Sequence, residues 1–119
     1  MNEEQLKEVA VLAEELGFKP RTLSTGVTFE KFTRVDKGLP LNDMCYYLLL
    51  CEIQKWLREV HNIHISPMFI GPDTNKYQYR IDVEGSGNTG EYSKWFTNFE
   101  ECFVDGLMFG LKLIKNENN

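Results

Sequence analysis

The chain has 119 residues, of which 42% are hydrophobic and 26% are charged, and its formal net charge is −5. This composition is typical of a globular protein, and the length suffices for a single domain with one modest core. The negative charge disfavours attraction of the whole molecule to nucleic acid or to anionic lipid. The longest apolar run, residues 44–51, is too short to cross a bilayer, so we expect no membrane partner.

The start of the chain and its cysteines indicate a compartment. The N-terminal residues MNEEQLKEVA are acidic, unlike the basic and then apolar start of a secretory signal. No CxxC pair occurs, and all three cysteines lie in apolar helical stretches, where reduced and buried thiols are common: Cys45, Cys51 and Cys102. We therefore expect a cytoplasmic protein.

Residues 1–40 are predicted to form an N-terminal extension made of one helix and one short strand. Apolar residues recur at helical spacing over residues 3–16, and Gly17 stands where a C-terminal cap belongs. The opposite side of this helix carries mostly glutamates, which indicates a solvated acidic face. Residues 26–33 alternate as a strand does.

The segment after this helix reverses the charge of the chain, because its basic residues outnumber its acidic ones. They are Lys19, Arg21, Lys31, Arg34 and Lys37. These side chains are the candidate contacts for nucleic acid in an alternative interpretation of the protein.

Residues 41–115 are predicted to form an α-β-β-β-α core. A helix begins at Asn42 or Asp43 and reaches about His61, with apolar residues at helical spacing. The first half of this helix, MCYYLLLC, is apolar on all sides, so it must be covered on more than one side. Either the N-terminal helix and strand or a second copy of the chain covers it.

The middle of the core changes from a helical period to a period of two. Residues 63–69, 77–83 and 91–96 alternate as strands do, and turn residues separate the first two stretches. We expect an antiparallel meander of three strands. The two core helices should cover one face of it, with the N-terminal helix and strand extending or covering the sheet.

The last helix is predicted to start with a capping box made by Thr97 and Glu100. Its inward stripe contains Gly106 and Gly110. A glycine costs about 1 kcal/mol against alanine inside a helix. Both positions should therefore allow a close approach to the sheet or to the preceding helix.

A G-x-G-x-x-G pattern occurs at Gly85, Gly87 and Gly90. A dinucleotide fingerprint needs a strand before the glycines and a helix starting after them. Here the glycines run from one predicted strand into another, and Glu84 and Glu91 flank them with negative charge. We interpret the segment as a hairpin connection and expect no cofactor.

Other candidate chemistry has a simpler structural explanation. His61 and His64 form H-x-x-H, but the helix is expected to end between them and no third ligand has matching spacing. Cys102 lies among Phe99 and Phe103, which favours packing over catalysis. We expect no metal, no catalytic residue and no enzymatic activity.

Two surfaces are candidates for a partner contact. Helical geometry places Met108 in the middle of the polar face of the last helix, beside Glu101, Asp105 and Lys112, with Val104 and Phe109 at its margins. The second surface is the sheet face opposite the helices. It is expected to bring together Arg80, His64, Gln78 and Trp95.

Two resemblances extend this interpretation. The α-β-β-β-α order over residues 42–115 is similar to that of the double-stranded-RNA-binding domain, which implies a shared topology. That family grips phosphates with a lysine-rich start to its last helix, whereas the same position here reads TNFEECFVD and is acidic.

The second resemblance lies in two stretches of the amino-acid sequence. QKWLREVHNIHI (residues 54–65) and FTNFEECFVDGLMFGLKLIK (residues 96–115) resemble a family of small, uncharacterised proteins from phages and integrated elements of gut anaerobes. This chain differs by placing Cys102, Phe103 and Val104 where alanine, leucine and glutamate are usual. The resemblance implies a shared fold and a bacterial host cell.

We therefore expect a non-enzymatic accessory protein of a phage or mobile element. It should act through a protein contact, either with an unknown partner or with itself as a homodimer. The alternative function is a nucleic-acid-binding module that uses residues 19–37, although the net charge disfavours binding to nucleic acid.

Overall fold

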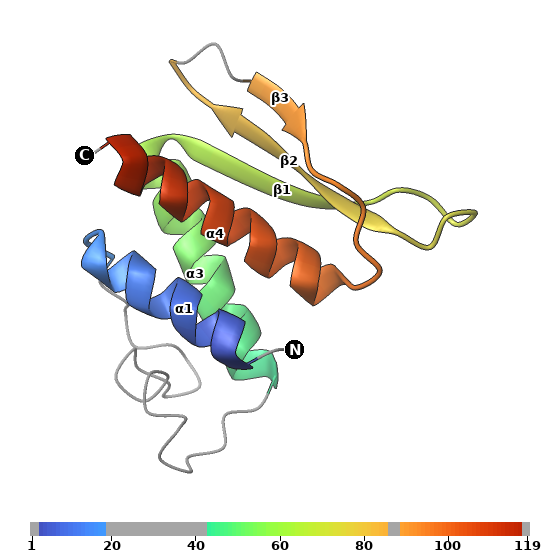
Figure 1. Ribbon diagram of the computed structural model, residues 1–119, viewed down its shortest axis with the longest axis horizontal. Helices are drawn as coiled ribbons and strands as arrows, with labels where there is room; N and C mark the ends of the chain where they lie inside the picture. The colour runs from blue at the N-terminus through green and yellow to red at the C-terminus, as the bar shows by residue number, and fades with distance from the viewer. Residues whose placement is uncertain (1–2, 19–42, 86–88, 118–119) are drawn as a thin grey trace.

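The computed structural model describes residues 3–18, 43–85 and 89–117 (Figure 1). In this part of the chain the elements follow in the order α1 (Glu3–Glu15), α3 (Asp43–His61), β1 (Ile63–Phe69), β2 (Tyr77–Val83), β3 (Thr89–Tyr92) and α4 (Phe99–Glu117). The protein is therefore of the α+β class, as the sequence predicts. The strand expected at residues 26–33 and the five basic residues between Lys19 and Lys37 lie outside the described residues.

The three strands form an antiparallel sheet in the order β1-β2-β3, which confirms the predicted meander. The register pairs Ile65 with Ile81 and Ser66 with Arg80. Side chains alternate across a strand, so the odd-numbered residues of β1 and β2 face the helices and include the buried Ile63, Ile65, Tyr79 and Ile81. The even-numbered residues form the opposite side, which we call the outer sheet face: His64, Ser66, Met68, Gln78, Arg80 and Asp82.

Both core helices pack on the same face of the sheet, and α1 lies against α4 on the side away from the sheet (Figure 1). At the end of α1, the ring of Phe18 makes an edge contact with Trp56 of α3, with 5.6 Å between the ring centroids. The N-terminal helix therefore covers the helical layer. It does not cover the outer sheet face, and the expectation that it extends or covers the sheet is wrong for this helix.

The core centres on α4, which contacts β1, β2, α1 and α3. The inward stripe of α4 is buried as predicted. Its buried apolar side chains are Cys102, Phe103, Val104, Leu107, Leu111 and Ile114. In the apolar half of α3, Leu49 and Leu50 are each 1% exposed, so the chain itself covers that part of the helix.

Two glycines let α4 approach its neighbours closely. A Cβ added at Gly106 would lie 2.7 Å from Cγ2 of Ile65, and one added at Gly110 would lie 3.2 Å from Cδ1 of Leu57. Gly106 thus faces the sheet, and Gly110 faces α3 as well as the sheet. The predicted role of both glycines is confirmed.

Helix ends follow local capping chemistry. Gly17 has a φ of 107°, and the N–H of Phe18 donates to the carbonyl of Ala13 at 2.9 Å, which closes α1 as predicted. At the start of α4 the expected capping box is wrong. The side chain of Asn98, one residue after Thr97, accepts the N–H of Glu101 at 3.1 Å and takes the capping position.

The third strand runs from Thr89 to Tyr92, whereas the predicted strand covers residues 91–96, and a bulge lies within it opposite Ile81 and Asp82. Beyond Tyr92 the hydroxyl of Ser93 accepts the backbone N–H of Tyr79 at 2.9 Å in place of a carbonyl. Backbone pairing then resumes where Phe96 and Tyr77 exchange two hydrogen bonds. The chain from Thr89 to Phe96 therefore pairs with β2 in two separate short stretches.

The outer edge of β1 is partly closed. The N–H of Glu84 donates to the carbonyl of Asn62, so the even-numbered residues of β1 direct their backbone groups to β2 and the odd-numbered ones direct theirs outward. At this edge Pro67 has no N–H to offer. The carbonyl of Ile65 is already taken by the side chain of Gln54 in α3, at 2.7 Å.

Candidate functional site

A hollow lies over the outward face of α4, between α1 and the segment that joins β3 to α4. Its volume is about 460 Å³. Its lining residues are Gln5 and Glu8 of α1, Lys94 and Phe96 of the joining segment, and Glu101, Val104, Asp105, Met108 and Lys112 of α4. A second hollow of about 510 Å³ runs along the seam between α1 and α4 and shares Glu8, Met108 and Lys112 with the first. We call the two together the α1–α4 groove.

The sequence correctly groups the α4 side of this groove. Met108 does lie beside Glu101, Asp105 and Lys112, as helical geometry predicts. Two of the expected margin residues differ, however. Val104 is 5% exposed because it joins the core beside α1, so its side chain is not open to a partner, and Phe109 is 42% exposed but does not line the groove.

The floor of the second hollow is apolar. Val11, which is 37% exposed, and Leu12 reach it from α1, while the partly buried Met108 reaches it from α4. Sequence reasoning missed the α1 side, which it interpreted as a solvated acidic face. The available signal was the apolar pair Val11 and Leu12 beside that face.

The rim of the groove carries more acidic than basic side chains. Its carboxylates belong to Glu4, Glu8, Glu15, Glu101 and Asp105. Its ammonium groups belong to Lys7, Lys94 and Lys112. An apolar floor inside a charged rim is the usual arrangement of a protein interface.

Contacts of the buried Tyr79 order one wall of the groove. The hydroxyl of Tyr79 donates to Oδ2 of Asp105 at 2.8 Å, and the ring of Tyr79 stacks on Phe96 with centroids 6.1 Å apart. Burial, together with the hydrogen bond and charge of Asp105, raises the pKa of Tyr79 well above its ordinary value of 10.0. The phenol thus remains a neutral donor at physiological pH and holds the Asp105 carboxylate in place.

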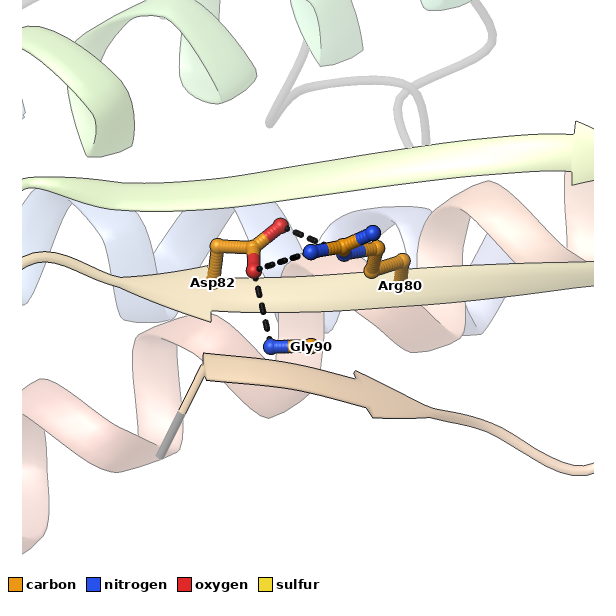
Figure 2. Close-up of polar contacts among 3 residues, drawn as sticks. All are labelled: Arg80, Asp82 and Gly90. Atoms are coloured by element: carbon orange, nitrogen blue, oxygen red, sulfur yellow. Dashed lines mark hydrogen bonds and ion pairs between the residues drawn. The ribbon is translucent and has the colours of Figure 1, made fainter. Parts of the chain in front are cut away.

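The outer sheet face has a different arrangement, shown in Figure 2. Arg80 donates from Nε to Oδ2 of Asp82 at 2.9 Å and from Nη2 to Oδ1 at 3.2 Å. The backbone N–H of Gly90 donates to the same Oδ1 at 2.7 Å. The guanidinium of Arg80 also lies over the ring of Tyr92, 5.9 Å from its centroid. These contacts tie β2 to β3 across the bulge, so Arg80 is already engaged within its own sheet.

The same contacts explain the glycine pattern. Gly85 and Gly90 have φ values of 82° and 76°, and the last glycine of the pattern lies in β3, so a strand and not a helix stands at its end. The N–H of Gly90 points at a carboxylate of the chain itself. The segment connects two strands of a hairpin, as predicted.

The other predicted members of the outer sheet face are only partly brought together. His64 pairs with Glu84 at 3.2 Å, and Gln78 donates to the carbonyl of Ser93 at 3.2 Å. Trp95 is 55% exposed, but it lies beyond the end of β3, in the segment that leads to α4.

The histidines and the buried cysteine do not share a site. His61 packs edge-on against Trp56 with centroids 4.7 Å apart, whereas His64 lies on the outer sheet face. Cys102 is fully buried, and burial raises the pKa of its thiol to about 11. Within residues 3–18, 43–85 and 89–117, no three histidine, cysteine or acidic side chains are grouped so that they could hold a metal ion.

The Asp82 contacts predict a dependence of stability on pH. The hydrogen bond from Arg80, helped by the N–H of Gly90, lowers the pKa of Asp82 below its ordinary value of 3.8. The stabilisation is therefore complete above pH 3.8 and is lost as the pH falls through the lower, folded-state pKa. We expect Asp82→Asn to be less stable than the wild type at pH 6 in urea unfolding, with a difference that shrinks toward pH 3.

The control for this experiment is Glu59→Gln, which removes one exposed negative charge from α3. This variant measures how the loss of one surface charge alone changes the free energy of unfolding over the same pH range. A difference between wild type and Asp82→Asn that stays constant from pH 6 to pH 3 would contradict the role assigned to the carboxylate.

Comparisons of the chain with protein-family models, with curated proteins and with solved structures found no match. Among the helices of the described residues, none is both long and apolar enough to span a bilayer. A function therefore has to be inferred from the side chains of the chain itself.

Proposed function

We propose that this chain is a non-enzymatic accessory protein of a phage or mobile element, which acts in the cytoplasm of a bacterial host by binding a protein partner through the α1–α4 groove. The observation that carries the proposal is the apolar floor of Val11, Leu12 and Met108 at the seam of two helices, surrounded by charged side chains. Apolar centres with polar rims are typical of surfaces that bind proteins.

The chemistry of the groove favours a protein over a small molecule. Small-molecule sites orient their ligands with a few converging polar groups, often from the backbone. Here the polar lining consists of side chains along the rim, most of them glutamates and lysines, among them the exposed Glu8, Glu101 and Lys112. Met108 adds a flexible and polarisable side chain that adapts to the shape of a partner.

The origin and setting of the protein are inferred from the sequence. The resemblance of residues 54–65 and 96–115 to small proteins of phages and integrated elements supports a role in such an element. The reduced state expected for the cysteines supports the cytoplasm.

A site-specific crosslink tests this proposal. A photoreactive phenylalanine analogue placed at Met108 should give one discrete adduct with another protein in cells that carry the element. The same analogue at Val60, which is 59% exposed on α3 and outside the groove, should not give that adduct. The proposal fails if position 108 yields no adduct with a protein.

An adduct of twice the mass of the chain would identify the partner as a second copy. That result would keep the protein contact and make the protein a homodimer through this groove.

A further inference from the structure

We propose that the α1–α4 groove accepts a basic amphipathic segment, in which lysine or arginine side chains flank an apolar anchor. This inference rests on the proposed function and specifies the chemistry of the partner. It is carried by three features of the groove: where its carboxylates lie, how an existing cation sits in it, and where its floor is apolar.

Carboxylates line the first hollow from two sides. Glu8 reaches it from α1, whereas Glu101 and Asp105 reach it from α4. Asp105 is held by the hydroxyl of Tyr79 at 2.8 Å, so this negative charge has a defined position. Over the whole groove the lining contains five carboxylates and three lysines, so its charge is negative and complements that of a cationic partner.

The wall formed by the joining segment already holds a cation. Nζ of Lys94 lies 5.3 Å from the centroid of the Phe96 ring, which is within the range of cation–π attraction. Glu101 and Asp105 line the same hollow as this ring. A lysine or arginine of a partner would therefore meet the carboxylates of Glu101 and Asp105 beside a wall that already accommodates a cation.

An apolar side chain of the partner fits the second hollow. Its floor is formed by Val11, Leu12 and Met108, and Glu4, Glu8 and Glu15 stand along its α1 side. A helix that presents apolar residues on one face and basic residues at its margins matches both the floor and the rim.

Charge argues against two other occupants. An acidic or phosphorylated segment would be repelled by the excess of carboxylates. A second copy that docked by the same groove would bring its own acidic rim against this one, since such an interface uses the same surface twice.

A pair of synthetic peptides tests the inference on the full chain. The first probe is an 18-residue helix of leucine and lysine with the leucines on one face, and the second has glutamate in place of every lysine. Fluorescence anisotropy measures the binding of each peptide. The solution contains about 0.15 M salt, which screens attraction between charges that are far apart. We expect the lysine peptide to bind at least tenfold more tightly than the glutamate peptide.

Two variants decide whether binding occurs in the groove. Met108→Glu should weaken the lysine peptide at least tenfold although it adds a negative charge, because the apolar anchor loses its floor. The double variant Glu8→Lys and Glu101→Lys should also weaken it at least tenfold. Both replaced glutamates are exposed, so this variant keeps the test valid if Met108→Glu does not fold. The control Val60→Glu adds the same charge outside the groove and should not weaken binding.

Several results would overturn the inference. Equal binding of the two peptides would do so, and so would tighter binding of the lysine peptide to Met108→Glu than to the wild type, which indicates attraction by net charge alone. A native mass that halves on Met108→Glu substitution would assign the groove to a second copy.

The two proposals fail separately. A crosslink from position 108 to another protein, together with no binding of the lysine peptide, leaves the proposed function intact and rejects the chemistry inferred for the partner. Absence of any crosslink in cells rejects the proposed function, even where the peptide binds.

Discussion

Gly106→Ala is expected to lower the free energy of unfolding by about 1–2 kcal/mol. The new Cβ would lie 2.7 Å from Cγ2 of Ile65 and 3.2 Å from Cγ of Tyr79. Neither neighbour moves easily, because Ile65 is 2% exposed and Tyr79 is held by Asp105. Overpacking costs about 1–3 kcal/mol, and a contact of 2.7 Å with neighbours that cannot move places this variant in the upper part of that range. The gain of about 1 kcal/mol from removing a helical glycine offsets part of the cost.

Gly110→Ala is the matched control in the same helix. Its Cβ would lie 3.2 Å from a terminal methyl of Leu57 and 3.4 Å from methyl groups of Ile63 and Ile65. A small shift of these side chains suffices, so the gain in helix propensity should cancel the cost to within about 1 kcal/mol. Urea unfolding of both variants checks the prediction. If Gly106→Ala is as stable as Gly110→Ala, the sheet does not approach α4 as closely as described.

Leu107→Ala is expected to lower the free energy of unfolding by about 2–5 kcal/mol. Leu107 is 0% exposed in the buried stripe of α4, so truncation loses the burial of its side chain and leaves a cavity. Phe109, two residues away, is 42% exposed, and its truncation to alanine should cost about 1 kcal/mol or less. Thermal and urea unfolding measure both changes.

The comparison tests which of the two truncations lowers the free energy of unfolding more. A larger loss for Phe109→Ala than for Leu107→Ala would mean that α4 is rotated about its axis. Met108 would then no longer face the groove, and both proposals for that surface would lose their basis.

The sequence predicts the core because its apolar residues keep one period within each element. The stripe of α4 and the alternation in β1 and β2 are local properties, and the contacts of Gly106 with Ile65 and Tyr79 match them. The same rule fails at Val60. Helical spacing places it on the inward face of α3, yet it is 59% exposed in the last full turn of that helix.

Element ends are predicted less well, because neighbouring residues compete for the same role. Thr97 and Asn98 both have side chains that can cap a helix, and the structure uses Asn98. In the third strand, the hydroxyl of Ser93 replaces a backbone acceptor and β3 ends at Tyr92. A pattern of alternating residues does not reveal that a side chain replaces a backbone group in a hydrogen bond.

One side of the candidate site could also be predicted from the sequence, and the other could not. Its α4 side follows from helical geometry, so Met108, Glu101, Asp105 and Lys112 are grouped correctly from the sequence. Its α1 side depends on where the N-terminal helix packs, which no local pattern fixes. The hollow beside Val11 therefore appears only in three dimensions.

The partly closed edge of β1 limits how copies of this protein can assemble through their sheets. Pro67 and the bond from Gln54 to Ile65 leave this edge a poor template for an added strand. In the described sheet, strand addition is therefore favoured at the β3 side, and two copies joined there use that edge of both. Such pairing leaves the partly closed β1 edges as the two outer edges of the joined sheet of the described residues, where further strand addition is disfavoured.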